Sequence, residues 1–228
     1  MAFTRWVAGG VLALQLAPAL GQPEHPCGSL ENAYGPFDYR RERGRLLEIV
    51  DRAHFNSDVR NLRRGQSGSL GGDIDYTLRA SPNHHLALAS IAELGIRSKQ
   101  RHPQALKRSI DCYFDRAMRF QPDDHLVRML YASFLQRMNF NADALVIVES
   151  IERMPNLVGM SHFNLGMLLM DLGETERALG HAWQALEMGW PRTDLKERLQ
   201  KGGKWRDPPD AGAQAPQAAQ SASQAAPR

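Results

Sequence analysis

The sequence has only two cysteines, only one long apolar run and none of the common catalytic motifs, and each shortage narrows the range of functions. Cys27 and Cys112 allow at most one intramolecular disulfide. The apolar run, residues 6–16, is too short for a comfortable membrane span, so no stable membrane insertion is expected. The motifs HExxH, CxxC and GxSxG are missing, and the glycine-rich stretch 65–72 lacks the Lys-Ser/Thr ending of a phosphate loop. The chain is therefore not expected to be an enzyme or to carry a cofactor.

The N-terminal segment 1–21 is typical of a secretory signal peptide. A single cation, Arg5, precedes the apolar run, and small residues follow it up to Gly21. Cleavage is expected after Gly21, with Ala19 as the alternative position. A second interpretation is an uncleaved N-terminal anchor, which the shortness of the apolar run disfavours.

A regular spacing of small and apolar residues marks the segment before Pro191. Its members are Asn164-Leu165-Gly166, Leu172-Gly173, Ala178-Leu179, Ala182 and Ala185-Leu186. This set resembles one unit of the tetratricopeptide repeat (TPR) family, whose period is about 34 residues. The resemblance implies an all-α fold, a right-handed superhelical solenoid of antiparallel helix pairs with helical caps. It also implies a concave groove that binds a protein or peptide partner.

The same pattern, in weaker form, extends towards the N-terminus. The predicted repeats are a half-unit at 73–82 and three units at 83–122, 123–156 and 157–192. In the second of these units, Asn139 stands near the place of the turn glycine, which asparagine can fill because it tolerates the left-handed conformation. In the first, the helix that begins near Asn83 is expected to end at Gly95, and a polar insertion at 96–103 follows it.

Segments of other character flank the predicted repeats. Residues 22–72 are expected to form an N-terminal cap, with helices at 45–54 and 57–64, Ser57 as the cap of the second, and a glycine and serine loop at 65–72. Residues 193–206 are expected to form a C-terminal capping helix that begins after Thr193. The remainder, 207–228, is rich in Pro, Ala, Gln and Ser, and this composition predicts disorder.

The two cysteines are expected to form a disulfide, because an exported protein meets oxidants and the count is even. Cys27 follows Glu24-His25-Pro26 and lacks the small residues that precede a lipid-modified cysteine. The alternative is a buried Cys112 inside a helix and a free Cys27 thiol in a mobile arm.

The eight histidines predict no metal site. His84 and His85 are adjacent, and neighbouring helical residues point about 100 degrees apart, so the two rings do not readily share one ion. His84 is expected at the surface, and His85 in the groove or the cap.

The formal net charge is +3 and the sequence pI is near 9.0, with arginines concentrated before the predicted repeats at positions 40, 41, 43, 60, 63 and 64. Such a basic face can attract anionic polymers. Export argues against a nucleic-acid partner. The alternative function is therefore a cell-wall or envelope-polymer binding protein that uses this face and the flexible tail.

In the TPR family, the concave surface comes mainly from the first helix of each unit. Carried over by position, the resemblance predicts a partner-binding groove formed by His85, Arg128, Met160, Phe163, Asn164, Met167, Met170 and Asp171. Flexible methionines suit irregular apolar or helical peptides. The alternative is that some of these side chains face the core between repeats. The cationic set that binds acidic peptide tails in one TPR subgroup is incomplete, with only Asn164 and Arg128 in suggestive places.

Together these observations predict an exported, non-catalytic scaffold or adaptor of the Gram-negative periplasm. Its expected partner is a protein or peptide of the cell envelope.

Overall fold

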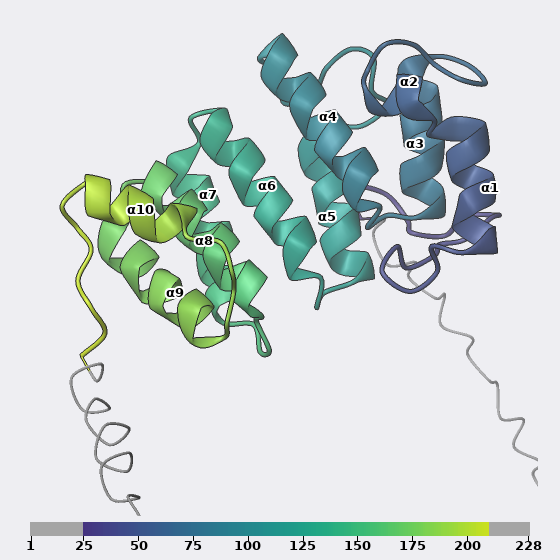
Figure 1. The fold of residues 1–228 in the computed structure, drawn as a ribbon. Helices are drawn as coiled ribbons and strands as arrows, with labels where there is room; N and C mark the ends of the chain where they lie inside the picture. Colours follow the sequence, from purple (N-terminus) through teal and green to yellow (C-terminus); the bar gives the residue numbers. More distant parts are fainter. Residues whose placement is uncertain (1–24, 210–228) are drawn as a thin grey trace, which may run out of the picture.

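The structure, a computed structural model, describes residues 25–209, and this part of the chain is helical without strands (Figure 1). It contains ten helices: α1 (Arg45–His54), α2 (Ser57–Arg60), α3 (Leu70–Ala80), α4 (His85–Ser98), α5 (Ile110–Phe120), α6 (His125–Arg137), α7 (Asn141–Glu152), α8 (Gly159–Asp171), α9 (Thr175–Glu187) and α10 (Asp194–Lys201). The prediction of an all-α fold is confirmed. The predicted signal peptide, 1–21, and residues 210–228 of the predicted disordered tail lie outside the described residues.

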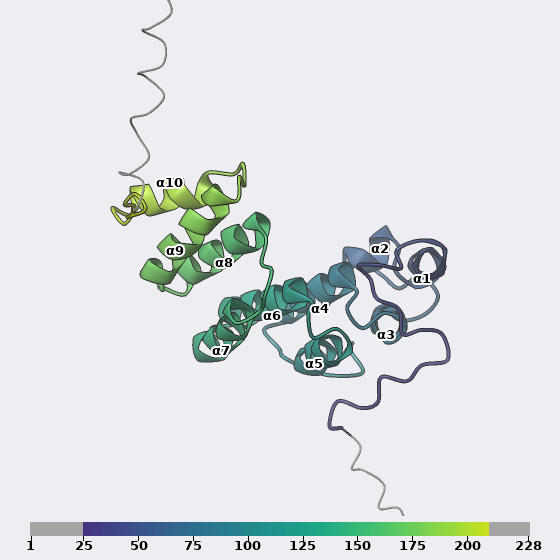
Figure 2. The same cartoon turned by 90° about the horizontal axis from the view of Figure 1, so that it is seen from below.

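The helices follow one another along the molecule, from α1 at one end to α10 at the other (Figure 1). Helix α4 packs against α6 and α6 packs against α8, so three helices that alternate along the chain form a continuous row. The intervening helices cover this row, with α5 on α4 and α6, α7 on α6, and α9 on α8. Figure 2 shows α5 and α7 on the same side of α4 and α6. At the two ends of the row, α2 packs on α4 and α10 packs on α8.

Turns with a left-handed residue separate paired helices. Asn139, between α6 and α7, has φ of 65°, and Gly173, between α8 and α9, has φ of 83°. Both residues tolerate this region, glycine because it has no Cβ and asparagine because its short polar side chain bonds locally. Asn139 therefore occupies the position expected from the sequence.

Two predicted boundaries are wrong. The predicted loop at 65–72 ends at Ser69, whose Oγ accepts a hydrogen bond from the N–H of Gly72 and so caps α3. Helix α4 continues through Gly95 to Ser98 and ends where Lys99 takes a left-handed φ of 55°. The polar insertion is therefore shorter than the sequence indicates.

Two predicted caps also differ from the structure. Asn56, not Ser57, caps α2 by accepting from the N–H groups of Asp58 and Val59, and α2 ends at Arg60. Thr193 precedes α10 as expected, but its hydroxyl accepts no backbone N–H and instead donates to the Glu197 carboxylate, so it does not cap the helix.

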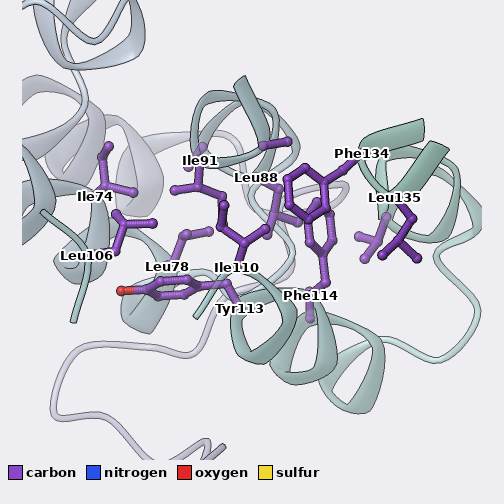
Figure 3. Packing of buried hydrophobic residues seen from close by; sticks show 14 of the residues in the cluster. Ile74, Leu78, Leu88, Ile91, Leu106, Ile110, Tyr113, Phe114, Phe134 and Leu135 are labelled. Atoms are coloured by element: carbon purple, nitrogen blue, oxygen red, sulfur yellow. The ribbon is translucent and has the colours of Figure 1, made fainter. Parts of the chain in front are cut away.

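Buried aliphatic and aromatic side chains join the helices. The largest cluster lies among α3, α4, α5 and α6 (Figure 3) and includes Ile74, Leu78, Leu88, Ile91, Leu106, Ile110, Tyr113, Phe114, Phe134 and Leu135. Towards the C-terminus, α8 and α9 meet closely. A Cβ on Gly166 would lie 2.3 Å from Leu195 Cδ2 of α10, and Ala178 of α9 is fully buried. Small residues at these two positions fit the observed packing, and a side chain at Gly166 would have to displace Leu195.

The disulfide Cys27–Cys112 is confirmed. It joins the segment before α1 to the first turn of α5, with the two Cα atoms 5.1 Å apart. Arginines of α5 reinforce this attachment, since Arg116 donates to the carbonyl of Cys27 at 3.3 Å and Arg119 to that of Gly28 at 3.0 Å. The N-terminal segment is therefore fixed to the helical array covalently and by hydrogen bonds.

The burial of Ala178 predicts that Ala178→Asp strongly destabilises the protein. The new carboxylate would be enclosed between α8 and α9 without room or a partner, at a cost on the order of 3 to 5 kcal/mol. Urea unfolding followed by circular dichroism measures this change. Gln184→Asp, at an exposed position of the same helix, is the control and should change stability by no more than about 0.5 kcal/mol. Equal stability of the two variants would contradict the packing described here.

The disulfide predicts that the native protein has no alkylatable thiol and that reduction lowers its melting temperature. The cross-linked residues are 85 positions apart, and closing such a loop contributes at most about 4 to 5 kcal/mol in the chain-entropy model. Mass spectrometry after alkylation, and thermal melts with and without reductant, test both statements. Two thiols that alkylate freely in the native protein would disprove the cross-link.

Candidate functional site

An open groove lies between α6 and α8, with a volume of about 260 Å³. Four side chains from each helix line it: Leu126, Met129, Leu130, Ser133, Asn164, Met167, Leu168 and Asp171. On both helices these positions are spaced i, i+3, i+4, i+7, which places them on one helical face. Five are apolar, and Ser133, Asn164 and Asp171 add polar groups. The arrangement suits contact with an elongated apolar surface that carries a few polar atoms.

Three of the eight predicted groove residues, Asn164, Met167 and Asp171, line this groove. Asp171 also forms an ion pair of 2.7 Å with Arg198 of α10. Met170 is half-buried and packs against two core clusters. The lining residues of α6 were missed by sequence analysis, although Leu126 and its neighbours have the same spacing as those on α8.

Two predicted groove residues on α8 lie elsewhere. Phe163 is only 4% exposed and packs in the core cluster of α8, α9 and α10, close to the ring of Trp190. It follows that Phe163 is a core residue, and its prediction as a groove residue is wrong. One helical position turns a side chain by about 100 degrees, which is enough to move it from the groove face to the core. Met160 is exposed but is not among the residues that line the groove.

Arg128 also lies away from the groove. Its guanidinium donates to Ser150 Oγ of α7 at 3.4 Å and to the carbonyl of Pro122 at 3.2 Å, and it contacts the sulfur of Met118 of α5. The side chain therefore faces the covering helices α5 and α7. Its predicted role in the groove is wrong because the register of α6 points it in the other direction.

The adjacent histidines are both buried. His84 is fully buried, its Nδ1 accepts from the N–H of Ala87, and its Nε2 lies 2.9 Å from Asp51 Oδ1. His85 is 8% exposed, and its Nε2 lies 2.8 Å from Asp124 Oδ2. The prediction of a surface His84 is therefore wrong, because its buried ring caps α4. His85 was expected in the groove or the cap; it does not line the groove, and its ring packs on Tyr39 of the N-terminal segment and pairs with Asp124.

A buried polar network surrounds the turn that precedes α4. The Asn83 amide donates to Asp38 Oδ1 at 2.7 Å and to Asp124 Oδ2 at 2.9 Å, and its oxygen accepts from the N–H of Tyr39 at 3.0 Å. Arg40 adds an ion pair of 3.0 Å with Asp38. Burial would raise the pKa of Asp38, but the hydrogen bonds from Arg40 and Asn83 outweigh it and lower this pKa to about 2. The network links the N-terminal segment, the turn before α4 and the turn before α6.

A second buried carboxylate, Asp73 at the start of α3, organises the glycine and serine loop. It accepts hydrogen bonds from the backbone N–H groups of Gln66, Ser67 and Gly68 and pairs with His54 at 2.9 Å. Burial raises the pKa of Asp73, but hydrogen bonds from the Ser67 hydroxyl, from His54 and from the N–H groups of Gln66 and Ser67 outweigh it and lower this pKa to about 2. The hydrogen-bonding groups of this cluster pair with one another, so the cluster has a structural role.

The basic N-terminal face is less free than its composition indicates. Arg40 forms an ion pair with Asp38 inside the network around Asn83. Arg63 and Arg64 both form ion pairs with Asp58, at 3.7 Å and 2.7 Å. Arg43 lies over the ring of Tyr39 and donates to its carbonyl. Arg63 and Arg64 share a single carboxylate and remain largely exposed, so part of the positive charge of this face stays accessible to an anionic polymer.

A cleft on the other side of α8 contains a histidine pair that sequence analysis missed. The cleft has a volume of about 480 Å³ and is lined by Glu152, Leu157, His162, Arg177, Gly180, His181, Trp183, Gln184, Glu187 and Pro208. His162 Nδ1 and His181 Nδ1 are 2.8 Å apart. The two residues are 19 positions apart in the chain, so no local sequence motif predicts the pair.

Within residues 25–209, one group of three potential metal-binding side chains has mutually close donor atoms: His25, Cys27 and Asp115. The Cys27 sulfur is bonded to Cys112, so it cannot act as a thiolate ligand. This group is therefore better explained by the disulfide attachment than by a metal.

No model of a known family matches the chain, and no curated protein and no solved structure matches it either. Among the helices of residues 25–209, none combines the length and the apolar composition that a bilayer crossing requires.

The lowered pKa values of Asp38 and Asp73 predict a loss of stability in acid. Each carboxylate stabilises the fold above its ordinary pKa of 3.8, and this contribution is lost as the pH falls towards the folded-state pKa of about 2. Each group contributes about 2 kcal/mol. The free energy of unfolding, from urea titrations between pH 5 and pH 2, should therefore fall steeply below about pH 4. Asp73→Asn should be less stable at neutral pH and should show a shallower acid dependence; an unchanged slope would contradict the assignment.

Proposed function

We propose that this chain is an exported, non-catalytic adaptor of TPR-like architecture, and that the groove between α6 and α8 binds an apolar segment of a cell-envelope protein. The observation that carries the proposal is the groove itself. Its apolar and polar side chains come from two helices that alternate along the chain. Stacked helix pairs create such a surface because each pair has to bury its apolar face on the next.

The order and pairing of the helices support the TPR-like architecture. Helices α4 and α5, α6 and α7, and α8 and α9 fit three repeat units, with α3 as a half-unit and α10 as the C-terminal cap. The left-handed turn residues Asn139 and Gly173 and the close approach at Gly166 fit the same scheme. In the proposed right-handed solenoid, α4, α6 and α8 form the concave face.

The size of the groove favours a peptide over a small metabolite. A volume of about 260 Å³ is below the range of about 300–1,000 Å³ that is usual for small-molecule pockets. The groove is lined along each helix, from Leu126 to Ser133 and from Asn164 to Asp171, which suits an elongated segment. Met129 and Met167 supply flexible thioethers that adapt to apolar side chains, and Asn164 and Ser133 can pair with polar atoms of the bound segment.

The cross-link supports export. Disulfides form and persist in oxidising compartments such as the periplasm and are rare in the bacterial cytosol. The Cys27–Cys112 bond, together with the predicted signal peptide, favours a periplasmic protein. The alternative, a polymer-binding protein, relies on the arginine face, where Arg40 and Arg41 pair with Asp38 and where Arg63 and Arg64 share Asp58. The groove, in contrast, gathers eight side chains from two helices into one surface. We therefore prefer the groove as the binding surface.

Photo-crosslinking tests the proposed groove in living cells. The photoreactive amino acid p-benzoylphenylalanine is placed at position 133 or 164, on the groove, and at position 146 as a control. Val146 is 62% exposed on α7 and is outside the groove. We expect a discrete adduct from the two groove positions and none from the control, with mass spectrometry of the adduct identifying the bound segment.

Introduction of two positive charges into the groove is then tested by measuring affinity for a synthetic peptide of the identified segment. Ser133→Arg combined with Asn164→Arg should weaken binding at least about tenfold, which is a loss of about 1.4 kcal/mol, because two cations would face an apolar segment. Val146→Arg should bind as the unmodified protein does, and all variants should melt alike. Equal crosslinking from position 146, or unchanged affinity in the double variant, would exclude the groove as the binding surface.

A further inference from the structure

His162 of α8 and His181 of α9 face each other across the cleft described above, with their Nδ1 atoms 2.8 Å apart. A contact this short between two neutral imidazoles needs one ring to donate and the other to accept. The neighbouring carboxylate decides which. Glu152 Oε1 lies 3.2 Å from His181 Nε2, so this nitrogen carries the proton of His181 and donates it to Glu152.

It follows that His181 Nδ1 presents a lone pair to His162. A single proton, carried by His162 Nδ1, then lies between the two rings. Glu152 is itself held by Arg177, whose Nη2 donates to Oε2 at 2.7 Å. Burial raises the pKa of Glu152, but the bonds from Arg177 and His181 outweigh it and keep the carboxyl ionised. A carboxylate on the outer nitrogen of a ligating histidine, fixed by a further partner, is the usual support of a metal-binding imidazole.

Both rings are suited to be neutral ligands. Burial lowers the pKa of His181, although Glu152 opposes this effect, and burial together with the proximity of His181 lowers the pKa of His162. A metal ion binds imidazole only in its deprotonated, neutral form. The lowered pKa values therefore favour the neutral form of both rings at neutral pH, which is the form that binds a metal ion.

The cleft supplies access and space. His162 and His181 line a volume of about 480 Å³, together with the side chains of Gln184, Glu187 and Trp183. The C-terminal segment forms part of the wall, since Pro208 lines the cleft and Trp183 Nε1 donates to the carbonyl of Arg206 at 2.9 Å. An ion between the two rings would have room for water or a further oxygen ligand on its open side.

We propose that His162 and His181 bind one divalent transition-metal ion of the zinc class through their Nδ1 atoms, in place of the proton they share. On binding, His162 transfers its proton from Nδ1 to Nε2, so both Nδ1 lone pairs face the ion and no net charge is lost. Two nitrogens at about 2.0–2.1 Å from a tetrahedral zinc ion are about 3.3 Å apart. The two nitrogens therefore have to separate by about half an ångström, and each ring has to turn so that its Nδ1 lone pair points at an ion that lies beside the line between the nitrogens. Glu152 continues to orient His181.

The proposed site is independent of the proposed partner groove. His162 precedes Asn164 by two residues, which turns its side chain by about 200 degrees around α8. The metal cleft and the groove therefore lie on opposite faces of the same helix. Loss of one activity need not affect the other, so the two proposals can fail separately.

Zinc titration of the protein, prepared without a polyhistidine tag and competed against a chromophoric chelator, tests the site. We expect one equivalent to bind to the unmodified protein. Glu152→Gln should weaken binding about 10- to 100-fold, and His162→Gln and His181→Gln should each weaken it by more than that. His25→Gln is the matched control, because it removes the ligand from the other cluster, near Asp115, and it should bind zinc as the unmodified protein does.

Imidazole nitrogen NMR of the unmodified protein keeps the test independent of how well the variants fold. Addition of zinc should shift the Nδ1 resonances of His162 and His181 and leave that of His25 unchanged. The proposal is overturned by zinc binding without these two shifts, by unchanged affinity in folded His162→Gln and His181→Gln proteins, or by the absence of stoichiometric zinc binding.

Discussion

The buried amide of Asn83 is the contact on which the N-terminal half of the molecule depends. It lies between two carboxylates, Asp38 and Asp124, and both would be costly to bury without its N–H donors. Because Asp124 also caps α6 by accepting from the N–H of Val127, the same cluster fixes the start of α6 relative to α4. Truncation of Asn83 would leave acceptors unsatisfied in the interior, which is more damaging than the loss of an exposed pair.

The geometry of the groove depends on the Asn83 cluster and on the packing of α6 and α8. Helix α6 supplies half of the groove, and its direction is set at the N-terminus by Asp124 and along its length by packing against α4, α7 and α8. The close approach at Gly166 fixes α8 in the same way against α9 and α10. Rigid helices that carry the lining residues limit how much a partner has to order on binding. The proposed binding surface is thus preformed on the scaffold and does not depend on a loop.

Sequence analysis identified the features that depend on local conformation or on composition. One or two residues were enough to predict three of these features: the turn at Asn139, the small residue at Ala178 and the Cys27–Cys112 pair. The positions of Phe163 and Arg128 were predicted wrongly. A shift of one position along a helix turns a side chain by about 100 degrees, which is enough to move it from the groove to the core or to a covering helix. The His162–His181 pair was not predicted. It exists only because α8 and α9 are antiparallel neighbours, and this juxtaposition is a property of the packing that no spacing in the sequence records.

The contacts of Arg40 and Cys27 have a consequence for the order in which this half of the protein can assemble. The Arg40 guanidinium meets Asp123, which lies 83 residues further along, and Cys27 is bonded to Cys112, 85 residues further along. Because a chain is synthesised from its N-terminus, the Arg40–Asp123 contact cannot form until the turn before α6 has been made. The segment that comes first in the chain therefore completes its contacts only after helices α1 to α5 have been synthesised.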